Sequence, residues 1–110
     1  MFTTTLPQEL YAMIDRNEDL VLVDVLPQES YLRQHLPGAI NIPIDSDNFE
    51  TLVEDLIPDK SKLVIVYCEK KDCDESLRGA QRIAAMGYKN VSDYETGLEG
   101  WEQQGYEFDQ

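Results

Sequence analysis

Two cysteines carry most of the nucleophilic chemistry that this sequence could perform. Cys68 directly follows the apolar run 63–67 (LVIVY), and Cys73 lies five residues further along the same polar segment. A cysteine between a strand end and a helix start can be held as a thiolate, because the helix N-terminus and the loop N–H groups favour negative charge. The thiolate is the nucleophilic form, so Cys68 is a candidate nucleophile that needs neither a metal nor a histidine base.

Position alone leaves the role of each cysteine open. Free cysteines are often inert core residues, which is the simplest alternative for Cys68. Cys73 is either a chance cysteine in a polar loop or a second thiol that meets Cys68, resolves an oxidised form of it and closes a disulfide. Two cysteines and one histidine, His35, are poor material for a zinc site. We therefore expect no metal and no cofactor.

The loop that contains both cysteines is acidic. Four carboxylates and two lysines lie between Cys68 and Ser76, a net charge of −2. This charge would repel an anionic substrate and raise the pKa of the Cys68 thiol, opposing the helix dipole. Arg78 follows in the first helical turn, where it could contact an anion or pair with Asp74 or Glu75. The candidate loop residues are Glu69, Lys70, Lys71, Asp72, Cys73, Asp74, Glu75 and Ser76.

One further use of such a loop is phosphate chemistry, which requires an arginine at a fixed position. A loop of the form Cys-x5-Arg clamps phosphate with its arginine, and here the sixth residue after Cys68 is Asp74. A carboxylate cannot clamp a phosphate and would repel it. The sequence therefore argues against a phosphatase.

Four short segments predict the strands that position this loop. The strongest is 63–67, immediately before Cys68. Continuous apolar runs suit strands that are covered on both faces, as in a parallel sheet. The predicted strands are 20–23, 39–42, 63–67 and 91–94.

Helical spacing and turn residues predict helices between and around these strands. Thr5 is expected to cap the first helix, and Ser46 or Asp47 to cap the third. Gly87 is a natural stop for the fourth, and Trp101 in the last is expected to face the core. The predicted helices are one after Thr5, then 28–34, one containing 49–56, 77–87 and 98–104.

The alternation of strands and helices predicts an α/β domain with a mostly parallel sheet. Ligands bind beyond the carboxyl ends of the strands in such sheets. Cys68 follows the end of the strongest predicted strand, so topology points to it independently of its chemistry. No repeat, linker or low-complexity segment divides the chain, and we expect residues 1–110 to form a single domain.

Composition limits the partners that this protein can bind. The chain has 22 acids against 9 bases, a net charge of −13. Such a surface repels nucleic acid and anionic membranes, so we expect neither as a partner. No run reaches the length of a membrane helix, and the N-terminus does not read as a signal peptide, so a cytoplasmic location is the expectation. The oligomeric state is left open.

Five groups of residues, in the same order along the chain, carry a resemblance to a known family. Together they cover about residues 5–108 and resemble the rhodanese-like domain family. They are 20–25 (LVLVDV), Glu29 with 35–43 (HLPGAINIP), 64–68 (VIVYC), Ser76 with Ala80, and the pattern of Gly97, Gly100, Trp101 and Gly105.

The resemblance implies a three-layer domain in which helices flank a central sheet of about five strands. It also implies a sulfurtransferase activity. Cys68 would attack the outer sulfur of a sulfane donor, hold it as a persulfide stabilised by loop N–H groups, and pass it to a thiol acceptor or cyanide. Donor and acceptor could each be a small molecule or a protein. We expect Asp24 and Glu29 to give structural support to the site, because a carboxylate at a strand end commonly accepts N–H bonds.

The loop departs from the family pattern in length and charge. Ser76 lies eight positions beyond Cys68, which makes the loop two residues longer than is usual in the family, and no arginine follows Asp24. We therefore expect a sulfane donor other than thiosulfate, a dianion. Two alternatives stay open: a thiol redox switch that uses Cys68 and Cys73, and a non-catalytic interaction module with the same fold.

Overall fold

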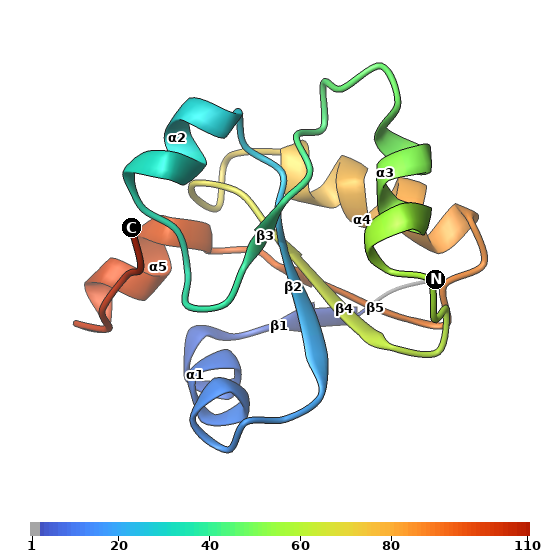
Figure 1. The fold of residues 1–110 in the computed structure, drawn as a ribbon. Helices are drawn as coiled ribbons and strands as arrows, with labels where there is room; N and C mark the ends of the chain where they lie inside the picture. The colour runs from blue at the N-terminus through green and yellow to red at the C-terminus, as the bar shows by residue number, and fades with distance from the viewer. Residues whose placement is uncertain (1–2) are drawn as a thin grey trace.

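Strands and helices alternate along the computed structural model, which describes residues 3–110 (Figure 1). The strands are β1 (Thr3–Thr5), β2 (Leu20–Asp24), β3 (Ile40–Asn41), β4 (Leu63–Tyr67) and β5 (Asn90–Tyr94). The helices are α1 (Pro7–Asp15), α2 (Gln28–Arg33), α3 (Phe49–Leu56), α4 (Glu75–Ala85) and α5 (Gly97–Gln103).

The five strands form one parallel sheet in the order β1-β5-β4-β2-β3. This confirms the predicted α/β fold with about five strands. β4 lies at the centre, and 64–67 is buried on both faces, as its continuous apolar sequence predicts. Asp24, Tyr67 and Tyr94 pair across the carboxyl ends of β2, β4 and β5. The residues after these strand ends therefore converge on one edge of the sheet.

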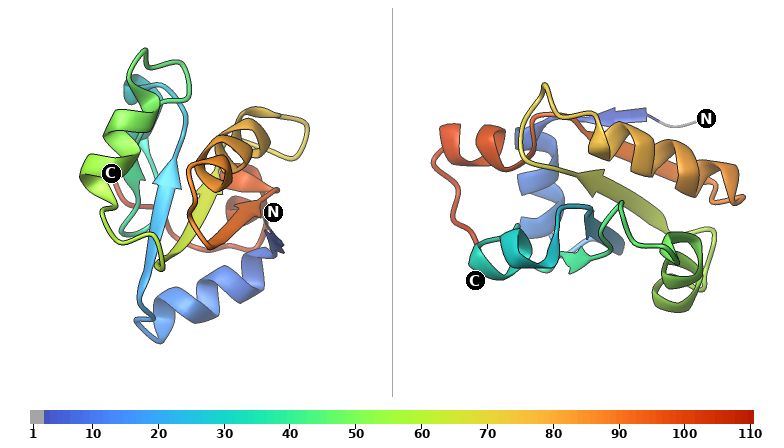
Figure 2. Two further views of the ribbon diagram at one scale, coloured as in Figure 1. Left: turned by 90° about the vertical axis from the view of Figure 1, so that its right-hand side faces the viewer. Right: turned by 90° about the horizontal axis from the view of Figure 1, so that it is seen from above.

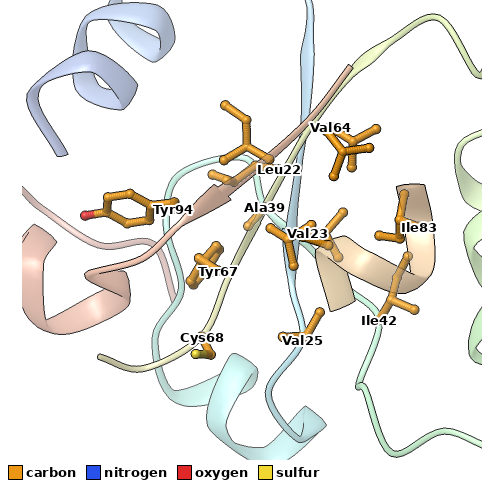
Figure 3. Close-up of a cluster of buried hydrophobic side chains, with 14 of the residues drawn as sticks. Leu22, Val23, Val25, Ala39, Ile42, Val64, Tyr67, Cys68, Ile83 and Tyr94 are labelled. Atoms are coloured by element: carbon orange, nitrogen blue, oxygen red, sulfur yellow. The ribbon is translucent and has the colours of Figure 1, made fainter. Parts of the chain in front are cut away.

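Helices cover both faces of the sheet. α1 lies on one side, and α3 and α4 lie on the other (Figure 2). α5 packs toward α1, since the Trp101 ring lies 5.9 Å from the Tyr11 ring. Trp101 is buried, as predicted. Figure 3 shows Val23 of β2 and Val64 of β4 on the side of the core where Ile83 of α4 lies, and Tyr94 of β5 beside Tyr67. Within residues 3–110, no helix is long and apolar enough to cross a membrane.

The start of the chain differs from the prediction. Thr5 does not cap α1 but belongs to the edge strand β1, where its hydroxyl bonds to that of Ser92. Leu6 is the first residue before the helix, and its N–H donates to Glu9 Oε1 at 2.8 Å. β-Branched threonines favour a strand, but three polar residues on their own do not give an apolar strand signal.

The start of α3 also differs from the prediction. Neither Ser46 nor Asp47 caps the helix, because Asn48 occupies the cap position. The N–H of Phe49 instead donates to the backbone carbonyl of Ser46 at 3.2 Å, so a turn precedes the helix. That turn places Phe49, which is fully buried, at the first helical position.

A buried polar network ties β2 to β4 at the edge where Cys68 emerges. The hydroxyl of Tyr67 donates to Asp24 Oδ2 at 2.8 Å and accepts from the Leu36 N–H at 3.0 Å. Asp24 Oδ1 accepts from the Leu26 N–H at 2.8 Å. Asp24 and Tyr67 are both fully buried, and burial raises the pKa of each side chain above its ordinary value.

The tightest backbone approach near Cys68 occurs at Gly97. Its φ of 57° is left-handed, and a Cβ there would collide with the carbonyl oxygen of Cys68 and lie 2.7 Å from the carbonyl carbon of Glu69. This approach lets the Leu98 N–H donate to the Cys68 carbonyl at 3.1 Å and the Glu99 N–H to the Glu69 carbonyl at 2.8 Å. The first turn of α5 therefore fixes the start of the Cys68 loop.

Replacing Tyr67 with Phe tests the buried network. We expect Tyr67→Phe to lower the free energy of unfolding by about 1–3 kcal/mol, because Asp24 Oδ2 and the Leu36 N–H lose their partner in the core. Tyr94→Phe is the matched control: Tyr94 is equally buried, but its hydroxyl has no partner within the described chain. Urea denaturation measures both variants, and equal losses would contradict a structural role for the Tyr67 hydroxyl.

Replacing Gly97 with Ala tests the approach of α5. Gly105→Ala is the control, since Gly105 has a φ of 78° but nothing within 4 Å of an added Cβ. We expect the left-handed conformation to cost each variant about 1–2 kcal/mol, and Gly97→Ala to lose a further ~1–3 kcal/mol to the backbone collision. Thermal denaturation gives both values. Equal stability of the two variants would show that the approach at Gly97 is not tight.

Candidate functional site

Cys68 lies at the carboxyl edge of the sheet, directly after β4 (Figure 3). The residue is fully buried, and its backbone carbonyl accepts the Leu98 N–H from α5. Strand and helix thus hold the Cys68 backbone from two sides. The predicted position beyond a strand end is confirmed, whereas the predicted role as nucleophile stays a prediction.

A disulfide joins Cys68 to Cys73, with the two Cα atoms 6.7 Å apart. The Cys73 N–H donates to the Lys70 carbonyl at 3.1 Å, which closes a turn over 70–73 and brings the chain back toward Cys68. The two thiols singled out in the sequence therefore meet. In this state neither sulfur can act as a nucleophile, so reduction must precede any chemistry at Cys68.

Carbonyl oxygens surround the Cys68 sulfur in this closed loop. The sulfur lies 3.9 Å from the Lys70 carbonyl oxygen and 3.6 Å from that of Cys73. These oxygens carry partial negative charge and do not stabilise an anionic sulfur. In the disulfide state these two contacts differ from the N–H nest that the family resemblance implies for a bound persulfide.

Most charged side chains of the loop point to solvent. Arg78 is also on the surface, where its Nε lies 3.6 Å from Asp74 Oδ1. The structure therefore shows an ion pair at Arg78, and its contact with an anion stays a prediction. The exposed loop residues are Glu69, Lys70, Lys71, Asp72 and Asp74.

The two carboxylates expected to support the site lie in different environments. Asp24 is in the buried network with Tyr67, from which it holds the strand end next to Cys68. Glu29 is exposed in the first turn of α2, where its negative charge complements the helix dipole.

Glu75 is the carboxylate that contacts a cysteine sulfur. Its Oε1 lies 3.1 Å from the Sγ of Cys73, and both residues are half-buried. Glu75 is the first residue of α4, so the helix fixes its backbone. A reduced Cys73 could donate its S–H proton to this carboxylate.

A cavity of about 140 Å³ adjoins Cys73. One of the residues that line it, Asp93, was not among the candidate site residues of the sequence analysis. Asp93 of β5 lines this cavity with 4% of its surface exposed, and its Oδ1 has no hydrogen-bond partner among the described residues. Burial raises the pKa of the Asp93 carboxyl, while Ser76 opposes the shift. No sequence signal singles out Asp93 beyond its place in the predicted strand 91–94.

A second cavity, of about 240 Å³, lies on the other side of the loop start. It joins the end of α2, the loop and α5, and three carboxylates and one lysine line it. An approaching anion therefore meets net negative charge here as well as at the first cavity. The lining residues are Gln34, Glu69, Lys70, Leu98, Glu99 and Glu102.

Comparison with known proteins agrees with this architecture. The family model described as "Rhodanese-like domain" matches residues 6–104. The structure of the BH2092 protein from Bacillus halodurans superposes with a TM-score of 0.87 at 29% identity, over 97% of this chain and 76% of that one.

Several curated relatives are named as sulfurtransferases. "Thiosulfate sulfurtransferase GlpE" of Coxiella burnetii is 30% identical over 78% of this chain and 75% of its own length. "Adenylyltransferase and sulfurtransferase UBA4" of Meyerozyma guilliermondii is 34% identical over 78% of this chain. This chain spans about a fifth of the UBA4 proteins of Meyerozyma guilliermondii and Candida albicans, matching 21% and 22% of their lengths. With nearly its whole length matched and its fold shared, the chain belongs to the rhodanese-like domain family.

Proposed function

We propose that this protein transfers sulfur through a persulfide on Cys68. The observation that carries the proposal is the position of Cys68, at the carboxyl end of the central strand within the segment that matches the family model. The Cys68 thiolate attacks the outer sulfur of a sulfane donor, and the donor's S–S bond breaks to leave a donor anion. An acceptor thiolate then attacks the outer sulfur of the persulfide and regenerates the Cys68 thiolate.

The charge around the loop favours a donor other than thiosulfate. Carboxylates line the cavities on both sides of the loop, and the whole chain carries a net charge of −13. This field repels a dianion and attracts a cation. A neutral, cationic or peptide-borne persulfide fits the site better, and the acceptor is a thiol on a small molecule or a protein.

The disulfide supports a second candidate function, a thiol redox switch. Oxidation of Cys68 and Cys73 to the disulfide removes the nucleophile and closes the loop over it. A dithiol reductant would restore both thiols by exchange. The two functions are compatible, because both use Cys68. Formation of the disulfide would block sulfur transfer, and its reduction would restore it.

Intact-mass analysis of the reduced protein tests sulfur transfer. Incubation with thiosulfate, polysulfide or cysteamine persulfide should add about 32 Da, the mass of one sulfur atom, to the wild type and to Cys73→Ser but not to Cys68→Ser. The cationic donor should load faster than thiosulfate, and added salt should raise the thiosulfate rate by screening the carboxylates. Failure of every donor to give the adduct would refute the proposal.

Thiol counting under mild peroxide tests the redox switch. The reduced wild type should fall from two titratable thiols to none as peroxide takes both electrons and forms water, and a dithiol should restore both. The thiols should disappear without formation of dimers on a non-reducing gel, since the bond is within one chain. Two free thiols after peroxide treatment would exclude the switch.

A further inference from the structure

We propose that Cys73 resolves the Cys68 persulfide by attacking its inner sulfur, which closes the disulfide and releases the outer sulfur as hydrogen sulfide, with Glu75 accepting the Cys73 proton. This inference rests on the proposed persulfide at Cys68. It adds a second outcome to that intermediate: release of sulfide when no acceptor thiol takes the sulfur.

The reaction balances without an external oxidant. The persulfide of Cys68 and the thiol of Cys73 give the Cys68–Cys73 disulfide and one H₂S. The bond between the inner and outer sulfur atoms breaks, and a bond between the two Sγ atoms forms. The outer sulfur leaves with the electron pair of the broken bond and takes up the proton that Glu75 removed from Cys73. A dithiol reductant then returns both cysteines to thiols.

The structure indicates which sulfur Cys73 attacks. A persulfide offers an inner sulfur, the Sγ of Cys68, and an outer one, and the disulfide shows that the Sγ of Cys73 reaches the inner one. The turn over 70–73 brings Cys73 there, while Cys68 itself is fully buried. An external thiol must reach the buried Cys68 from solvent, whereas Cys73 lies on the same loop and has the advantage of an intramolecular nucleophile.

Glu75 is placed to accept the proton of Cys73. Its Oε1 lies 3.1 Å from the Cys73 sulfur, within reach for proton transfer, and its backbone is fixed at the start of α4. A thiol must lose its proton to become the attacking nucleophile, and the acidic loop opposes free ionisation. A carboxylate in contact with the Cys73 thiol lowers the cost of ionisation, because it takes the thiol proton while the sulfur attacks.

The charge around the same cavity favours departure of the sulfide. The excess of negative charge destabilises an anionic persulfide and any hydrosulfide held in the loop, so expulsion to solvent lowers the electrostatic energy. The charged residues that line the cavity of about 140 Å³ beside Cys73 are Lys71, Asp72, Asp74, Asp93 and Glu95.

Decay of a preformed persulfide tests the role of Cys73. Reduced protein is loaded with a persulfide donor, desalted rapidly and left without any acceptor thiol, while intact mass and free sulfide are followed. The wild-type adduct of about 32 Da should convert to a species roughly 2 Da lighter than the reduced protein, with about one sulfide released per adduct. Cys73→Ser should keep its adduct at least about tenfold longer.

The matched pair Glu75→Gln and Asp72→Asn tests the proton acceptor. Each variant removes one negative charge from the loop, but only Glu75 contacts the Cys73 sulfur. We expect Glu75→Gln to slow sulfide release about tenfold at pH 7, and Asp72→Asn to stay within about twofold of the wild type. The deficit of Glu75→Gln should shrink toward pH 9, because rising pH favours the thiolate form of a cysteine and lessens the need for a proton acceptor.

The outcomes separate this inference from the proposed function. If neither the wild type nor Cys73→Ser takes up sulfur, the persulfide proposal itself fails. If both take up sulfur and lose it at the same rate, sulfur transfer stands and resolution by Cys73 is overturned. Recovery of the outer sulfur on Cys73, detected by peptide mapping, would also overturn attack at the inner sulfur. Equal rates for Glu75→Gln and Asp72→Asn would remove Glu75 from the mechanism.

Discussion

The hydrogen bond between Tyr67 and Asp24 is the constraint on which the functional edge of this protein depends. It crosses from β4 to β2 where both strands end, and the same Tyr67 hydroxyl also holds the Leu36 backbone. Each of these polar groups is buried, so each would be costly without its partner. The network therefore fixes the strand end that precedes Cys68 relative to the turn that follows α2.

A balance of opposing charges decides the chemistry of the loop. The N-terminus of α4 favours an anionic sulfur, whereas the loop acids and the carbonyl oxygens near Cys68 oppose it. A disulfide carries no charge, so the negative groups of the loop do not destabilise it. The state that the structure shows is thus the one in which the Cys68 sulfur is neutral, and a persulfide in this loop would be an electrostatically strained intermediate.

The sequence predicted the features that depend on local patterns. The apolar run 63–67 indicated the central strand, and its position before Cys68 indicated the edge of the sheet where the site lies. Features that depend on contacts between distant segments were not predictable. β1 is too short and too polar to give a strand signal, and its threonines pair with β5 only through the tertiary fold. Asp93 is buried because α4 and the loop cover it, which no periodicity reveals.

The two cysteines are anchored unequally, and this difference determines which sulfur of the disulfide a reductant attacks. Cys68 is fully buried and its carbonyl is bound by α5, whereas Cys73 is half-buried in a turn that the sheet does not hold. An incoming thiolate attacks the sulfur that it can reach, so the mixed disulfide forms on Cys73 and Cys68 departs as the thiolate. Reduction in this order would release the buried Cys68 sulfur first, as a thiolate still fixed at the end of β4.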